Sequence, residues 1–86
     1  MSTQTLADVH AGVAAVIEEV TGTPSDHAIL DADFVKDLGV DSLALVEVVV
    51  ATEERFGVRI PDDQVSDLRT VADLVDYVLH RAEPRA

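Results

Sequence analysis

Apolar residues recur at helical spacing along most of this chain, and this periodicity limits the folds that it can adopt. In the first segment they stand three and four positions apart, at Leu6, Val9, Val13, Val16, Ile17 and Val20. This spacing places side chains on one face of an α-helix, whereas a half-buried strand needs an alternating pattern. No segment of the sequence has a clear alternating pattern. The periodicity therefore predicts an all-α fold.

Capping residues indicate where the helices begin and end. Thr5 and Thr70 each stand three residues before an aspartate, which is the spacing of a capping box. Asp41 is a favourable N-cap residue, and Gly57 suits the end of a helix. The sequence predicts a bundle of three main helices and one short helix. We expect them at about residues 6–21, 42–56, 62–67 and 71–81.

A long loop separates the first two predicted helices. Residues 23–40 contain a proline, a glycine and several aspartates, and loops of this length in compact domains are often functional. We expect Phe34, Val35 and Leu38 to pin the loop to the core. At 86 residues the chain is long enough for one domain only, so residues 1–86 are expected to form a single unit with a flexible tail at 82–86.

The charge balance excludes several classes of partner. Seventeen acidic residues against six basic ones give a net charge of −11, which repels nucleic acid and anionic membrane surfaces. No apolar stretch approaches transmembrane length, and the N-terminus lacks the pattern of a signal peptide. The chain also has no cysteine, which excludes disulfides and thiolate metal ligands. We expect a cytoplasmic protein with basic protein partners.

Ser42 begins the second predicted helix. Free backbone N–H groups and the helix dipole favour an anion at this position, so a phosphodiester on the Ser42 hydroxyl would be stabilised there. Helix geometry alone leaves a second interpretation open, in which Ser42 is an ordinary residue of the first turn beside the Asp41 cap.

A longer sequence match favours the first interpretation. Residues 34–43 read FVKDLGVDSL, and this segment resembles the one that carries the modified serine of acyl carrier proteins. The similarity continues in the family's order and spacing over most of the chain. It includes Val46-Glu47, Glu53-Glu54, Phe56-Gly57, Ile60-Pro61-Asp62-Asp63 and Thr70-Val71.

The resemblance implies a carrier that is not itself an enzyme. A phosphopantetheinyl transferase would attach 4'-phosphopantetheine from coenzyme A to Ser42, with Asp41 helping to place a magnesium ion during the transfer. The thiol of this arm would hold acyl groups as thioesters. Ketosynthase, acyltransferase and tailoring enzymes would perform the chemistry, and the resemblance implies a monomer with no catalytic residue and no bound metal of its own.

The second predicted helix carries an extra apolar stripe, formed by Leu43, Val46 and Val50, which turns away from its core face. Neighbouring helices could cover this stripe, or it could be the exposed patch that partners contact in acyl carrier proteins. In the second case we expect a docking face in which acids border the stripe. The candidate acids are Asp37, Asp41, Glu47, Glu53 and Glu54. Two departures reduce the acidity of this face, since Ala44 and Arg55 stand where the family often has acids.

Several alternatives can be compared with this interpretation. A calcium loop that starts at Asp31 fails, because Lys36 would stand where glycine is needed. Ser42 lacks the glycines of a hydrolase nucleophile elbow, and His10, His27 and His80 have no ligand-like spacing. An aminoacyl or peptidyl carrier, or an unmodified acidic interaction module, remains as an alternative. The sequence leaves open whether the carrier serves fatty acid or polyketide synthesis.

Overall fold

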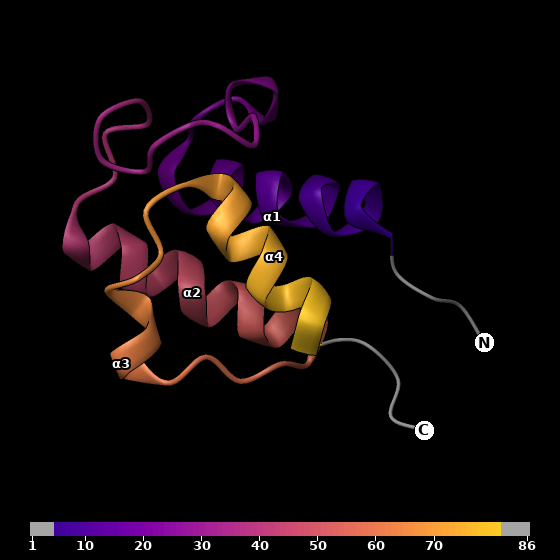
Figure 1. Ribbon diagram of the computed structural model, residues 1–86. Helices are drawn as coiled ribbons and strands as arrows, with labels where there is room; N and C mark the ends of the chain where they lie inside the picture. Colours follow the sequence, from indigo (N-terminus) through magenta and orange to yellow (C-terminus); the bar gives the residue numbers. More distant parts are fainter. Residues whose placement is uncertain (1–4, 82–86) are drawn as a thin grey trace.

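The structure is a computed structural model that describes residues 5–81, and the regular elements among these residues are all helices (Figure 1). The prediction of an all-α bundle is confirmed. A short 3₁₀ helix in the long loop was not predicted. The elements are α1 (Leu6–Thr21), η1 (Ser25–His27), α2 (Ser42–Phe56), α3 (Asp62–Val65) and α4 (Val71–Arg81). The flexible tail expected at residues 82–86 lies outside the described residues.

Both predicted capping boxes are present. At the start of α1 the Asp8 N–H donates to Thr5 Oγ1 at 3.1 Å, and the Thr5 N–H donates to Asp8 Oδ2 at 3.2 Å. Thr70 and Asp73 exchange the equivalent bonds at the start of α4, at 3.1 and 3.2 Å. These bonds satisfy backbone donors that have no partner within a helix, and so they fix the first turns.

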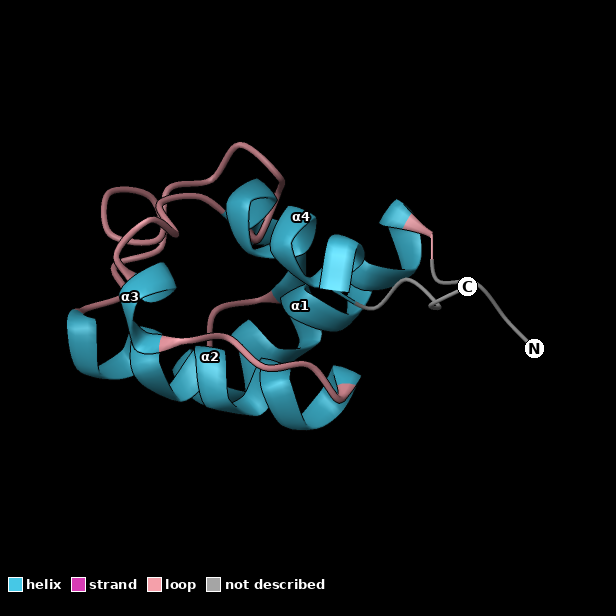
Figure 2. Ribbon diagram, turned by 60° about the horizontal axis from the view of Figure 1, so that its bottom comes forward, coloured by secondary structure: helices cyan, strands magenta, loops and turns pink. Residues whose placement is uncertain are grey.

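The core lies where α1 packs against both α2 and α4. Figure 2 shows α2 along one side of the bundle, with α1 and α4 on the other side. The residues that meet there are almost all aliphatic, and they include Val13 and Ile17 of α1, Val48 of α2 and Leu74 of α4, each with no exposed surface. Thr52 is also buried, and its hydroxyl donates to the Val48 carbonyl at 2.7 Å, so its burial leaves no donor unpaired.

The long loop is held to the start of α4 by backbone hydrogen bonds. The Phe34 N–H donates to the Arg69 carbonyl at 2.9 Å, and the Val71 N–H donates to the Ala32 carbonyl at 3.0 Å. Phe34 is 1% exposed and anchors the loop in the core as predicted, and Leu38 is partly buried against the core. The prediction for Val35 is wrong, because this side chain is 65% exposed. A tight turn through residues 33–37 directs it outward.

The helix α3 is shorter than predicted and ends at Val65. The following residues form turns instead, in which the Asp67 N–H donates to the Gln64 carbonyl at 3.1 Å and the Leu68 N–H donates to the Val65 carbonyl at 3.0 Å. These tighter turns bring Leu68 into the core. In Figures 1 and 2, α3 lies beside the N-terminal half of α2. No helix in the described part of the chain is long and apolar enough to cross a membrane.

Candidate functional site

Ser42 is the first residue of α2 and is exposed at the surface. The residue before the cap, Val40, is buried, and its N–H donates to the Phe34 carbonyl at 2.7 Å. This anchor fixes the chain immediately before the helix. Asp41 then caps α2, because its Oδ1 accepts the Ala44 N–H at 2.8 Å. The Ser42 hydroxyl makes no hydrogen bond with any described residue, so it is free to react.

Two aspartates stabilise the turn at residues 33–37, which precedes Ser42, through hydrogen bonds to backbone N–H groups. Asp33 Oδ1 accepts the N–H groups of Val35 and Lys36, each at 2.9 Å, and the carboxylate of Asp37 accepts the Asp33 N–H at 2.7 Å. The hydrogen bond from Lys36 N–H is the main reason why the pKa of Asp33 lies below its usual value. Sequence reasoning missed this role of Asp33, although an aspartate that accepts N–H groups two and three residues later is a known turn former.

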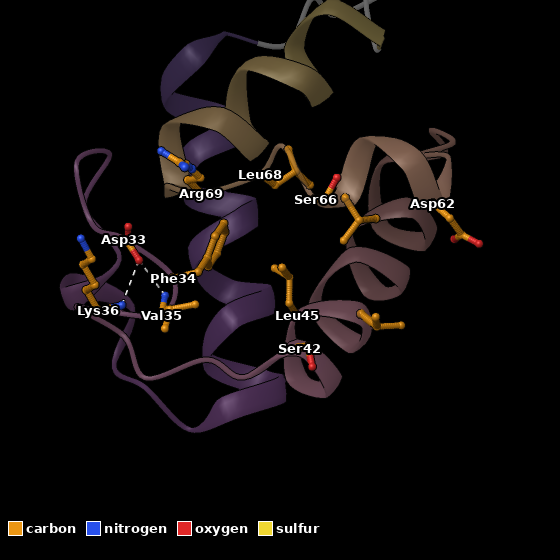
Figure 3. Close-up of a pocket in the computed structure, with 12 residues that line it drawn as sticks. Asp33, Phe34, Val35, Lys36, Ser42, Leu45, Asp62, Ser66, Leu68 and Arg69 are labelled. Carbon is orange, nitrogen blue, oxygen red and sulfur yellow. Dashed lines mark hydrogen bonds between the residues drawn. The ribbon is translucent and has the colours of Figure 1, made fainter.

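A pocket opens beside Ser42 between α2, α3 and the long loop (Figure 3). Its volume is about 600 Å³, which is within the range of small-molecule sites. Its central walls are apolar side chains from all three elements and from the segment after α3. They are Phe34, Leu45, Val46, Val65 and Leu68. A flexible chain attached at Ser42 would therefore meet an apolar space within its reach.

The second apolar stripe of α2 is exposed. Leu43, Val46 and Val50 are 70%, 49% and 46% exposed, so neighbouring helices do not cover them. Val46 and Val50 also line a shallow hollow of about 490 Å³ between α2 and the end of α1, where Val20 forms part of the wall. The interpretation in which neighbouring helices cover the stripe is therefore wrong, and the contact of this stripe with partners stays a prediction.

The five acids predicted for the docking face fall into two groups. Asp37, Asp41 and Glu53 have structural partners, because each carboxylate accepts a backbone N–H; for Glu53 the donor is Ile60, at 2.6 Å. Glu47 and Glu54 are exposed and line the hollow beside Val50, and they have no hydrogen bond or ion pair among residues 5–81. Their charges are therefore fully available to a partner.

None of the three histidines lines the pocket beside Ser42. His10 Nε2 lies 2.6 Å from the Ala28 carbonyl, which ties α1 to the long loop, and His80 Nδ1 lies 2.8 Å from the Asp76 carbonyl. Within residues 5–81 no three His, Cys, Asp or Glu side chains are grouped so that they could hold a metal ion.

Comparison with known proteins bears directly on the Ser42 region. Residues 11–78 match the family model described as a phosphopantetheine attachment site. The chain is 54% identical to the acyl carrier protein of Acidothermus cellulolyticus, over 83% of this chain and 84% of that protein. It is 46% identical to the acyl carrier protein of Thermobifida fusca, over 78% and 85%.

A third relative carries a more specific name. The meromycolate extension acyl carrier protein of Mycolicibacterium smegmatis is 44% identical, over 95% of this chain and 85% of that protein. These matches and the helical bundle confirm the resemblance seen in the sequence. The chain belongs to the acyl carrier protein family, whose members carry acyl groups on a phosphopantetheine cofactor.

Proposed function

We propose that Ser42 is the residue to which 4'-phosphopantetheine is attached. The observation that carries this proposal is the position of its hydroxyl, which is exposed and unbonded at the start of α2 and adjoins the pocket of about 600 Å³. The surroundings fit the group, because a helix N-terminus favours the phosphodiester and the apolar walls can contact the rest of the arm or its cargo. When bound, the arm supplies the thiol that a chain without cysteine lacks and holds the acyl group as a thioester.

Asp41 and the turn at residues 33–37 act as positioning groups in this proposal. Only Oδ1 of Asp41 is used for the cap, which leaves its other carboxylate oxygen for the magnesium ion that accompanies coenzyme A during transfer. The protein catalyses none of these steps itself. Its residues hold the attachment point at the surface, where the phosphopantetheinyl transferase and later enzymes can reach it.

The partners that we propose are separate enzymes with basic patches. They are the phosphopantetheinyl transferase, a ketosynthase, an acyltransferase and tailoring enzymes. The net charge of −11 and the unpaired carboxylates of Glu47 and Glu54 supply long-range attraction to such surfaces. Leu43, Val46 and Val50 then supply apolar area that is desolvated on contact. The carboxylates of Asp37, Asp41 and Glu53 already accept backbone N–H groups. We therefore expect these three acids to contribute less to partner binding than Glu47 and Glu54.

We further propose that the carrier works as a cytoplasmic monomer in fatty acid chain extension, in a system of separate enzymes. The names of the relatives support this pathway, since they include two acyl carrier proteins and a meromycolate extension acyl carrier protein. The segment from Asp41 to Leu45 resembles carriers of aromatic polyketide pathways, so a polyketide chain is the competing cargo. Mass analysis of the acyl groups on the protein isolated from its host separates the two, and an aminoacyl cargo would contradict both.

Incubation with coenzyme A, magnesium and a phosphopantetheinyl transferase tests the attachment site, with intact mass as the measurement. We expect the wild-type mass to rise by one phosphopantetheinyl group, and we expect no rise for Ser42→Ala. Ser66→Ala is the matched control, because Ser66 is another exposed serine that lines the same pocket, and this variant is expected to react fully. A wild-type chain that is never modified would support the acidic interaction module instead.

A further inference from the structure

The edge of the pocket beside Ser42 carries two basic residues, Lys36 and Arg69. They stand out in a chain that has only six lysines and arginines. Figure 3 shows both side chains on the loop side of the pocket together with Asp33, whereas Asp62 lies on the opposite side. Both basic residues of the pocket therefore lie at one edge, beside Asp33, and Asp62 lies across from them.

The backbone holds these two residues at neighbouring positions. The Phe34 N–H donates to the Arg69 carbonyl at 2.9 Å, and Asp33 and Thr70 form a β-bridge beside this bond. Lys36 follows in the turn that Asp33 caps. Because the backbone is fixed at both places, the fold places both residues at the same edge of the pocket.

The side-chain donors of this edge form no hydrogen bond within the described residues, whereas the nearby carboxylates accept backbone N–H groups. Neither Lys36 nor Arg69 forms a side-chain hydrogen bond or an ion pair within 4.0 Å among the residues that the structure describes, although both interact electrostatically with the nearby Asp33 carboxylate. The carboxylates of Asp33, Asp37 and Asp73 each accept backbone N–H groups. An ammonium and a guanidinium group therefore remain able to bind an oxygen acceptor that comes from outside the protein.

The positions of the head groups set the geometry of such an interaction. In Figure 3 the side chains of Lys36 and Arg69 lie on the loop side of the pocket, and the apolar side chains of Phe34 and Leu45 lie between Arg69 and Ser42. A chain that starts at Ser42 would cross this apolar space before it meets the basic edge. The long aliphatic stems of Lys36 and Arg69 allow the head groups to turn toward it.

We infer that this pocket takes acyl chains that bear an oxygen acceptor, a carboxylate or a carbonyl, toward their far end, and that Lys36 and Arg69 bind this acceptor. The inference rests on the proposed attachment at Ser42. A purely saturated chain would use the apolar walls alone. An oxygenated chain would contact the apolar walls and also bind Lys36 and Arg69 through its oxygen. The protein would therefore bind acyl chains differently according to whether they carry an oxygen acceptor far from the thioester.

Two cargoes of equal carbon number test the inference. Octanoyl and 7-carboxyheptanoyl groups are loaded from their coenzyme A thioesters by the transferase, and intact mass verifies each product. Thermal unfolding midpoints are then measured for wild type, Lys36→Gln, Arg69→Gln and the double variant. Arg59→Gln is the matched control, because Arg59 is exposed between α2 and α3 and does not line the pocket.

We expect the carboxylated cargo to raise the wild-type midpoint, with an increment that falls in Lys36→Gln and Arg69→Gln and with added salt, because salt screens charge pairs. The octanoyl increment should be the same in all variants, and Arg59→Gln should behave like wild type. An increment from the carboxylated cargo that survives in the double variant, or that is absent in wild type, overturns the inference while leaving attachment intact. Loading of either cargo onto Ser42→Ala would reject the attachment at Ser42 instead.

Discussion

Asp41 and Ser42 are adjacent, but the first stabilises the helix and the second is free for chemistry. The Asp41 carboxylate caps α2 through the Ala44 N–H, whereas the Ser42 hydroxyl bonds to no described residue. We therefore expect Asp41→Ala to lower the free energy of unfolding by about 0.5–2 kcal/mol, and Asp41→Asn to lower it much less, because asparagine also caps helices.

Ser42→Ala is the control for the Asp41 variants, because it changes the adjacent residue without removing the helix cap. Its free energy of unfolding should stay within about 0.5 kcal/mol of wild type, which is usual for surface substitutions. Urea denaturation of the variants measures both effects. A loss for Ser42→Ala as large as that for Asp41→Ala would mean that the hydroxyl belongs to the fold and would weaken the case for a free attachment point.

The pKa of Asp33 gives the loop a dependence on pH. Backbone N–H groups stabilise its carboxylate in the folded state, so the folded pKa is lower than the unfolded one. The resulting stabilisation is complete above the unfolded value of about 3.9 and is lost as the pH falls through the lower folded value. Thermal unfolding of wild type should therefore show a loss of stability below pH about 4 that is smaller in Asp33→Asn.

The control for this prediction is Asp31→Asn, since Asp31 is exposed and has no hydrogen bond or ion pair among residues 5–81. This variant should keep the wild-type pH dependence. Identical profiles for Asp33→Asn and wild type would show that the Asp33 carboxylate does not hold the turn.

At the scale of elements, α2 presents two apolar faces, and we propose that the exposed one docks partner enzymes. One face is buried in the bundle, and the other, formed by Leu43, Val46 and Val50, is exposed next to Glu47 and Glu54. Charge accelerates the encounter with a basic enzyme and is screened by salt, whereas apolar contact mainly slows dissociation. The two faces explain why the helix is apolar on so many sides.

Binding kinetics with the transferase can separate these contributions. We expect Glu47→Lys and Glu54→Lys to slow association about three- to tenfold at low salt and to flatten its salt dependence. Val46→Asp should mainly speed dissociation, because it places a charge in the contact. The control is Glu18→Lys, which makes the same charge change at an exposed position of α1. If the α2 variants behave like the Glu18 variant, this face is not where partners dock.

The sequence predicted the helices well because capping residues and periodicity are local signals. Thr5, Asp41 and Thr70 mark the starts of α1, α2 and α4, and each uses its side chain as the pattern indicates. Position 35 could not be predicted in this way, because its exposure follows from the turn that Asp33 makes and not from its own hydrophobicity. The same holds for the pocket, whose walls come from separated segments.

For the whole molecule, we expect the pocket to link cargo to stability. An acyl chain that enters it buries apolar area, and each CH₂ group so buried contributes about 0.8 kcal/mol at most. We expect the octanoyl protein to unfold at a higher temperature than the unacylated holo protein, by about 4–8 °C per kcal/mol gained. Equal midpoints would indicate that the chain stays in solvent.

A variant that fills the pocket provides the control. Val65 lines the space and is only partly buried, so Val65→Phe adds volume there. This variant should still accept phosphopantetheine but should lose most of the stabilisation by octanoyl. Retention of the full increment would place the acyl chain elsewhere.

The central claim is that the arm is attached at Ser42, and peptide mapping of the loaded protein tests it most directly. Trypsin cleaves after Lys36 and Arg55, and the resulting peptide of residues 37–55 contains only two hydroxyl side chains, those of Ser42 and the buried Thr52. Fragmentation of this peptide should place the phosphopantetheinyl mass on Ser42. An unmodified 37–55 peptide, with the added mass on the peptide that contains Ser66 or on any other, would contradict the account.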